Sequence, residues 1–251
     1  MGKLEGKVAI ITGSGKGIGK AYAKVFAREG AAVTVCCRTE AQGLAVVEEI
    51  KAEGGKAIFV PCDTADRAQV DNVVAKTVEA FGDIHILVNN AQAEPTPAPV
   101  EEITVDQLKL AMGSGYMGTL NFMQACFPYL KKNKGNIINT SSGSKTIGLP
   151  TKGAYASAKG AIEGISTIAA HEWGQYGITV NVVFPGAETE LYKNWAAANP
   201  EEAKMRLQAK ALRRNGDGEA DLAPIIVFLA SDASKFLTGQ MIYCDGTNYS
   251  R

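Results

Sequence analysis

Histidine is scarce in this chain of 251 residues, which contains only His85 and His171. The two lie far apart and have no matched third ligand, so we expect both to be structural and no metal to be bound. The five cysteines are odd in number and lack a zinc-like spacing. We expect small apolar core residues in a reducing compartment at all five positions, which are Cys36, Cys37, Cys62, Cys126 and Cys244.

An excess of either charge is also missing, because 26 basic residues balance 26 acidic ones. No basic run suggests nucleic acid or an anionic membrane, so we expect the partner to be a small molecule. No apolar run approaches the length that spans a bilayer, and the first residues form no apolar signal core. The sequence therefore predicts a soluble cytoplasmic protein.

What the chain does contain is enough apolar sequence for one sizeable core, since 46% of its residues are hydrophobic and 21% are charged. We expect a single domain over residues 1–251, with an insertion around 187–218 where the regular pattern breaks. Elsewhere short apolar runs alternate with longer helical patterns. The expected strands are 8–12, 32–36, 57–61, 84–89, 136–141, 179–184 and 241–244, and the expected helices are 17–28, 41–52, 67–81, helices within 104–132, 154–173 and 219–230.

These apolar runs show no polar alternation, as is typical of strands that are covered by helices on both faces. The pattern predicts an α/β fold with a doubly wound parallel sheet. Ligands of such sheets bind at the carboxyl ends of the strands. Four residues fall at such ends and are expected to line one crevice: Thr12, Asn89, Ser142 and Pro185.

A glycine-rich turn follows the first of these strands, with Gly13, Gly17 and Gly19 leading into a helix. Glycines here let the backbone approach a pyrophosphate and present helix N–H groups to it. The spacing is Gly-x-x-x-Gly-x-Gly, and glycines also serve simple tight turns. The strand before the turn and the helix after it favour a dinucleotide site.

The choice of dinucleotide depends on the end of the second strand, where a carboxylate would bind ribose hydroxyls and a cation would accept a 2′-phosphate. Cys37 and Arg38 stand there, and Lys16 lies in the glycine turn. We therefore expect NADP(H) to be preferred over NAD(H). The alternative is that Arg38 is only a solvated surface cation.

A second motif joins Tyr155 and Lys159, which lie four residues apart and so share one face of a helix. A free phenol has a pKa of about 10, too high for proton transfer at neutral pH. A cation roughly 4 Å away, at an effective dielectric of about 20, favours the phenolate by up to about 4 kcal/mol. Ser142 could hold the substrate oxygen. Alone, Tyr-x-x-x-Lys would be a chance pair, but its combination with the glycine turn indicates acid–base catalysis by Ser142, Tyr155 and Lys159.

In order and spacing, the motifs resemble the classical short-chain dehydrogenase/reductase family over essentially the whole chain. The matching pieces are residues 12–19, Asp63, Asn89-Asn90-Ala91, Ser142, Tyr155, Lys159, Asn181 and Pro185-Gly186. The resemblance implies a Rossmann-type sheet, a homotetramer, adenine binding by Asp63 and ribose binding by Lys159. The residues expected at the cofactor are Gly13, Ser14, Lys16, Gly17, Ile18, Gly19, Arg38, Asp63, Thr64, Asn89, Ala91, Tyr155, Lys159, Pro185 and Gly186.

Three positions depart from the family pattern. Gln92 replaces the glycine of Asn-Asn-Ala-Gly, and Gly115 stands where the family has a catalytic asparagine that helps to hold a water. Thr189 lies one position before the usual threonine, which is replaced by Glu190. The stretches around Gln92 and Gly115 are similar to a subgroup that includes bacterial NADP-dependent 12α-hydroxysteroid dehydrogenases.

The insertion carries an apolar stripe at helical spacing, formed by Leu191, Trp195 and Ala198. It could be a lid over a hydrophobic substrate, or it could pack against the protein itself or another subunit. We expect an NADP(H)-dependent oxidoreductase for a hydrophobic ketone or secondary alcohol, of which a steroid or bile acid is an example. The alternatives are a 3-oxoacyl thioester (acyl-carrier-protein) reductase and a catalytically silent NADP-binding regulatory protein.

Overall fold

The structure is a computed structural model that describes residues 2–247. Strands within this range form one parallel sheet in the order β3-β2-β1-β4-β5-β6-β7. They are β1 (Val8–Thr12), β2 (Ala32–Cys37), β3 (Lys56–Pro61), β4 (Ile86–Asn89), β5 (Asn136–Thr140), β6 (Thr179–Pro185) and β7 (Met241–Cys244). The sheet confirms the predicted doubly wound parallel architecture.

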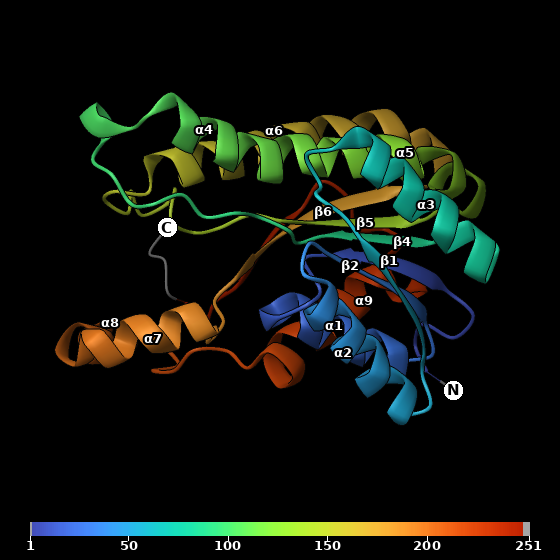
Figure 1. The fold of residues 1–251 in the computed structure, drawn as a ribbon, viewed down its shortest axis with the longest axis horizontal. Coiled ribbons are helices and arrows are strands. Elements are labelled where there is room, and N and C mark those ends of the chain that lie inside the picture. The colour runs from blue at the N-terminus through green and yellow to red at the C-terminus, as the bar shows by residue number, and fades with distance from the viewer. Residues whose placement is uncertain (1, 248–251) are drawn as a thin grey trace.

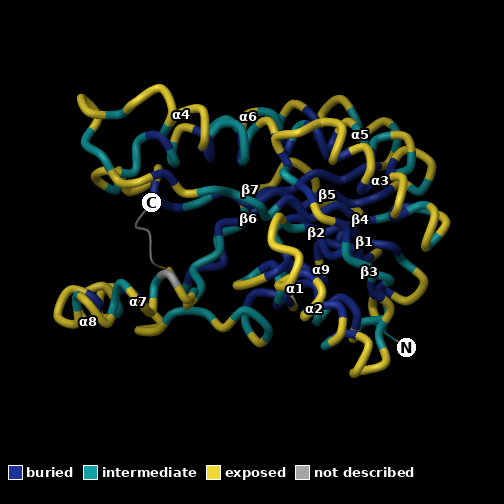
Figure 2. The backbone as a smooth tube through the Cα atoms, viewed as in Figure 1, coloured by how far each residue is buried: buried dark blue, intermediate teal, exposed yellow. Residues whose placement is uncertain are grey.

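Helices cover both faces of this sheet (Figure 1). The α-helices are α1 (Gly17–Arg28), α2 (Glu40–Ala52), α3 (Arg67–Phe81), α4 (Val105–Met112), α5 (Gly118–Asn133), α6 (Gly153–Trp173), α7 (Glu190–Ala198), α8 (Pro200–Ala209) and α9 (Ala223–Ala230). Helices α1, α2 and α9 lie on one face, whereas α3, α5 and α6 lie on the other. The inner strands β1, β2, β4, β5 and β6 are consequently buried on both sides, whereas the edge strands β3 and β7 are only partly buried (Figure 2).

Two hydrophobic cores result from this layering. In the first, Tyr22 and Phe26 of α1 pack with Ile226 of α9 against one face of the sheet. In the second, Val73 of α3 and Phe122 of α5 pack against the other face. All five side chains have at most 1% of their surface exposed, so the two cores hold the sheet between rigid layers.

The sequence pattern placed most boundaries within one or two residues, but it missed two irregular turns. The predicted helices within 104–132 are separated by a π-helical turn, Gly113–Met117, between α4 and α5. The helix predicted over 219–230 begins with a second π-helical turn, Gly218–Leu222, before α9. Turns of this kind are frequently found at functional sites.

The insertion forms α7 and α8, which project from the body as an arm (Figure 1). The arm follows the carboxyl end of β6, where the predicted crevice lies. None of the helices in the described part of the chain combines the length and apolar character needed to cross a membrane.

Candidate active site

The glycine turn is pressed against the end of β4. A Cβ at Gly13 would lie 2.9 Å from Ala91 Cα, and one at Gly19 would lie 2.4 Å from the Gly13 carbonyl oxygen. Gly17 differs, because its φ is +57° and a Cβ there would meet nothing within 4 Å. No side chain caps the start of α1, so the N–H groups of its first turn lack the side-chain acceptor that often pairs them, and the space beside Gly17 is open.

Two hydroxyls hold this turn from inside. Thr12 Oγ1 accepts the N–H groups of Asn90 (2.9 Å) and Ala91 (3.0 Å), which ties β1 to the segment after β4. Ser14 Oγ donates to Ile11 O (2.6 Å) and accepts from the backbone N–H of Cys36 (3.0 Å). Ser14, predicted among the cofactor residues, is therefore buried, with its hydroxyl used inside the protein.

Two cationic residues, Lys16 and Arg38, follow the point where this turn contacts the end of β2. A Cβ at Gly15 would lie 2.6 Å from Cys37 Sγ, so the residues that follow them, Lys16 and Arg38, stand at the same edge. Both side chains are exposed, and neither forms an ion pair within residues 2–247. The edge thus offers two cations to an anion with no carboxylate competing for them.

The next predicted residues lie further along the same edge. Asp63 follows β3, and its Oδ1 accepts the N–H of Ala65 at 3.0 Å. Thr64 is buried, and its hydroxyl donates to Ser114 O at 3.1 Å. Asn89 is also buried, and its amide donates to Asn139 Oδ1 at 2.8 Å. The last two side chains link neighbouring elements below the crevice.

Ser142, Tyr155 and Lys159 lie at the junction of β5 and α6. Lys159 is 2% exposed, and its Nζ donates to Thr140 O at 2.8 Å. The same Nζ lies 5.5 Å from the centroid of the Tyr155 ring. Ser142 follows β5, and its Oγ accepts the N–H of Ser144 at 3.3 Å. The predicted pairing of Tyr155 with Lys159 on one helix face is present.

Burial changes the chemistry expected of the lysine. Removal from water lowers the pKa of Lys159 to about 7, although the negative charges of Glu163 and Glu94 oppose this effect. The amine can therefore gain and lose a proton near neutral pH. The sequence argument treated it as a permanent cation, and only the packing of α6 on β5 reveals the difference.

Glu163 is a site residue that the sequence analysis missed. It lies one helical turn beyond Lys159, is buried, and accepts a hydrogen bond from Ser141 Oγ at 2.5 Å. Its other oxygen pairs with Lys145 Nζ at 2.9 Å. Glu163 thereby fastens the segment that carries Ser142 to α6. An acidic residue four positions after Lys159 in a mainly apolar helix was the available signal.

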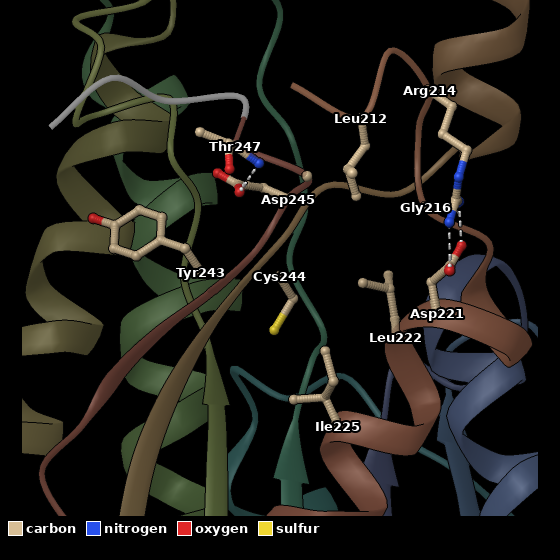
Figure 3. A pocket seen from close by; sticks show the side chains of 11 residues that line it. Leu212, Arg214, Gly216, Asp221, Leu222, Ile225, Tyr243, Cys244, Asp245 and Thr247 are labelled. Carbon is tan, nitrogen blue, oxygen red and sulfur yellow. Dashed lines mark hydrogen bonds and ion pairs between the residues drawn. The ribbon is translucent and has the colours of Figure 1, made fainter. Parts of the chain in front are cut away.

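Pro185 and Gly186 lie at the carboxyl end of β6, the strand next to β5. Gly186 donates its N–H to Cys244 O and accepts from the N–H of Gly216, both at 2.9 Å. A cavity of about 390 Å³ adjoins this segment, between the chain after α8, the start of α9 and the end of β7 (Figure 3). Ser142, Tyr155 and Lys159 do not line this cavity.

Within the arm, the three residues of the predicted apolar stripe do not share one environment. Trp195 packs against the Tyr192 ring (5.7 Å between centroids) and under the Arg206 guanidinium (4.3 Å). Ala198 is exposed, and the side chain of Leu191 lies outside the described part of the structure. Thr189, the displaced threonine, caps α7, because its hydroxyl accepts the N–H of Tyr192 at 3.2 Å. Glu190 is exposed.

The histidines lie away from this crevice. His85 accepts the N–H of Val8 at the start of β1, and burial lowers its pKa. His171 is exposed near the end of α6. Within residues 2–247, no cluster of three or more potential metal ligands occurs.

Comparison with known proteins shows the family to which this chain belongs. The model of the enoyl-(acyl carrier protein) reductase family matches residues 13–247. A 12α-hydroxysteroid dehydrogenase from Clostridium sp. is 37% identical, covering 98% of each chain. Rabbit (Oryctolagus cuniculus) L-fucose dehydrogenase is 34% identical over 97% of this chain and 85% of its own.

Among solved structures, a gluconate 5-dehydrogenase from Burkholderia cenocepacia, in complex with NADP and tartrate, superposes with a TM-score of 0.90. It is 31% identical, and the match covers 97% of this chain and 95% of the other. Members of this group use a nicotinamide cofactor, and the open N-terminus of α1 beside Gly17 fits its pyrophosphate. The protein thus belongs to the short-chain dehydrogenase/reductase family and is an oxidoreductase acting on alcohols and ketones.

Proposed function

We propose that this enzyme interconverts a hydrophobic ketone and its secondary alcohol with NADP(H), with a hydroxysteroid or bile acid as the expected substrate class. The observation that carries the proposal is the buried Lys159 amine, whose Nζ lies 5.5 Å from the centroid of the Tyr155 ring. Both residues follow the carboxyl end of β5, at the same end of the sheet as the glycine turn. The 12α-hydroxysteroid dehydrogenase relative supports the substrate class.

A bound nicotinamide would supply hydride to the carbonyl carbon or accept it from the alcohol. In reduction, the carbonyl π electrons move to the oxygen, which takes the proton of the Tyr155 hydroxyl. Ser142 donates a hydrogen bond to that oxygen and orients it. The Lys159 ammonium favours the phenolate that Tyr155 becomes, and it would also hold the nicotinamide ribose. Each group reverses its role in oxidation.

The proposed cofactor contacts follow the geometry of the crevice edge. The N–H groups of the glycine turn that are not bonded within the protein would bind the pyrophosphate, while Asp63 and Thr64 would border the adenine. The N–H of Ser14 is not among them, because it donates to Cys36 O at 3.2 Å. Asn89, Ala91 and the backbone of Pro185-Gly186 enclose the nicotinamide end. Ser14 and Ile18 act indirectly, by fixing the turn: Ser14 from inside and Ile18 by packing partly against the core.

Removal of Arg38 tests the preference for NADP(H). We expect Arg38→Ala to raise the Michaelis constant for NADPH about tenfold or more, because a charge-assisted hydrogen bond contributes about 1.5–3 kcal/mol. The constant for NADH should hardly change. Steady-state kinetics with both cofactors measure this, and Lys56→Ala, an exposed lysine at the amino end of β3, is the control. Equal effects on both cofactors would contradict the assignment.

We further propose that the arm of α7 and α8 is a lid that borders the substrate. Trp195→Ala should change relative kcat/KM values across a panel of ketones about tenfold or more, since an apolar contact discriminates by roughly 1–3 kcal/mol. NADPH affinity should stay the same. Met205→Ala, on the exposed face of α8, controls for general damage to the arm. Unchanged kinetics across the panel would show that Trp195 serves only the packing seen with Tyr192 and Arg206.

A 3-oxoacyl thioester reductase is the second candidate, favoured by the carrier-protein reductase description of the matching family model. A carrier protein would need a basic patch beside the crevice. The local lysine cluster, Lys131, Lys132 and Lys134, instead stands at the end of α5 before the start of β5, the opposite edge of the sheet. Lys132 is moreover paired with Asp83 at 2.6 Å. These placements favour the free ketone.

An assay of NADPH consumption, run in parallel with NADH, separates the ketone reductase, the thioester reductase and the silent regulatory protein. The panel contains oxo-bile acids, other cyclic ketones and an acetoacetyl thioester. Turnover of a steroid ketone supports the proposal, and turnover of the thioester alone would replace it. NADPH binding without any turnover would support a silent regulatory protein.

We also propose that the protein is cytoplasmic and forms a homotetramer. Exposed apolar side chains on α4 and α6, including Leu108, Leu110 and Ile168, support burial between subunits.

A further inference from the structure

Two consecutive turns of α6 bind the end of β5. From the first turn, Lys159 Nζ donates to Thr140 O at 2.8 Å. From the next turn, Glu163 Oε1 accepts the hydroxyl of Ser141 at 2.5 Å. Thr140 and Ser141 directly precede Ser142, so α6 fixes the point at which the chain leaves the sheet toward Ser142.

The carboxylate of Glu163 holds both ends of the segment that carries Ser142. While Oε1 accepts from Ser141 at one end, Oε2 pairs with Lys145 Nζ at 2.9 Å at the other. Ser142 lies between these two anchors, in a segment of residues 141–145 that is called the Ser142 turn below. One buried side chain thus fastens the whole Ser142 turn to α6.

The two ends of the Ser142 turn differ in their other support. At the first end, the N–H of Ser141 also donates to Val183 O of β6 at 2.9 Å, so the sheet itself holds this residue. At the second end, a Cβ on Gly160 would lie 3.9 Å from Lys145 Cδ, which shows that the lysine side chain runs along α6. Its ion pair with Glu163 ties this end to the helix.

Glu163 also supplies a negative charge that acts on Lys159. Burial lowers the pKa of this lysine, and the charges of Glu163 and Glu94 oppose that effect. The Glu163 side chain is only 8% exposed, so water and salt screen its charge little. Glu94 differs, because it is exposed and is paired with Lys152. Glu163 is therefore the buried carboxylate that favours the charged form of Lys159.

The other elements packed on α6 place few titratable side chains near Lys159. The strands β5 and β6 contain none. Asp106 and Lys109 of α4 are exposed, and Tyr116 lies on the π-helical turn. Helix α5 meets the far end of α6, where the rings of Phe127 and Trp173 lie 4.8 Å apart. A change of charge at Glu163 is therefore expected to reach Lys159 directly.

We propose that Glu163 is a positioning residue whose carboxylate clamps the Ser142 turn onto α6 and keeps the neighbouring Lys159 amine charged. The inference rests on the proposed function, because that mechanism needs Ser142 to orient the carbonyl oxygen and Lys159 to be an ammonium. Glu163 acts through these residues and does not contact the substrate. A displacement of about 1 Å in an orienting group can lower a rate about a hundredfold, so the clamp has a large effect available to it.

Glu163→Gln keeps the shape of the side chain and an acceptor for Ser141 but removes the charge. We expect kcat for ketone reduction to fall about tenfold or more, because the Lys145 end of the Ser142 turn is released, while NADPH affinity persists. The alkaline limb of the pH profile of kcat should move to lower pH, since Lys159 without this carboxylate loses its proton at lower pH. An unchanged kcat, or a fall in kcat with an unmoved limb, would overturn the proposal.

Lys145→Met separates the clamp from the charge. It keeps an unbranched side chain along α6 and leaves the Glu163 carboxylate in place, and Lys145 is exposed enough for the fold to tolerate the change. We expect kcat to fall while the alkaline limb does not move to lower pH. A downward shift as large as that of Glu163→Gln would show that a loosened turn, and not the lost charge, changes Lys159, which contradicts the proposal. Glu172→Gln, an exposed glutamate on the same helix, is the control and should leave kcat and the pH profile unchanged.

A direct titration of Lys159 separates this inference from the proposed function. The pKa is measured by ¹³C NMR of labelled lysine side chains, and the Lys159 signal is identified by its loss in Lys159→Met. A lower pKa in Glu163→Gln than in the wild type is expected whether or not the assayed ketones react. A wild type that shows this difference without turnover would reject the function alone. An active wild type in which the pKa equals that of Glu163→Gln would reject the role of Glu163.

Discussion

Tyr155→Phe is expected to lower kcat for ketone reduction by about 10²–10⁴-fold, the usual contribution of a positioned acid–base group. The change removes one hydroxyl and leaves the ring that lies 5.5 Å from Lys159 Nζ. Without that hydroxyl, the oxygen that gains negative charge during reduction loses the general acid that protonates it in the proposed mechanism. Single-turnover NADPH oxidation, followed by absorbance, measures the loss of the chemical step.

The structure offers a matched control in Tyr176, a partly buried tyrosine beyond the end of α6 that packs on Phe127. Tyr176→Phe removes the same hydroxyl away from the crevice and should keep kcat near that of the wild type. NADPH affinity and Tm should be retained in both variants. Full turnover by Tyr155→Phe would refute its proposed role and leave the proton donor unassigned.

Gly19→Ala is expected to lower NADPH affinity about a hundredfold or more and to destabilise the fold. The new Cβ would stand 2.4 Å from the carbonyl oxygen of Gly13, and a backbone atom cannot move aside as a flexible side chain can. The turn must shift, and losing two charge-assisted hydrogen bonds to a pyrophosphate costs about 3–6 kcal/mol. Overpacking itself costs about 1–3 kcal/mol of the free energy of unfolding.

Fluorescence titration with NADPH and thermal unfolding measure these two effects. Gly174→Ala is the control, because Gly174 is exposed just after α6, has helical dihedral angles, and a Cβ there meets nothing within 4 Å. That substitution should leave NADPH affinity intact and stabilise the end of the helix by roughly 0.5–1 kcal/mol. Wild-type affinity in Gly19→Ala would mean that the cofactor does not bind at this turn.

The sequence determined the layered fold and the edge at which the site lies. Continuous apolar strands and helical periodicity are local patterns, so they predicted the order of elements and the parallel sheet. The carboxyl ends of parallel strands lie at one edge of the sheet, so the sequence alone predicts that Thr12 lies near Asn89 and Ser142 near Pro185. Helical spacing alone put Tyr155 beside Lys159.

Tertiary structure decided what depends on contacts between distant segments. Burial against β5, invisible in a short motif, lowers the pKa of Lys159 to about 7. Ser14 turns inward because β2 presents the N–H of Cys36 to it. The contact of Gln92 with Gly115 arises only when the π-helical turn packs on the segment after β4. Local periodicity encodes which face of an element is apolar, whereas desolvation and steric fit depend on the neighbour that covers it.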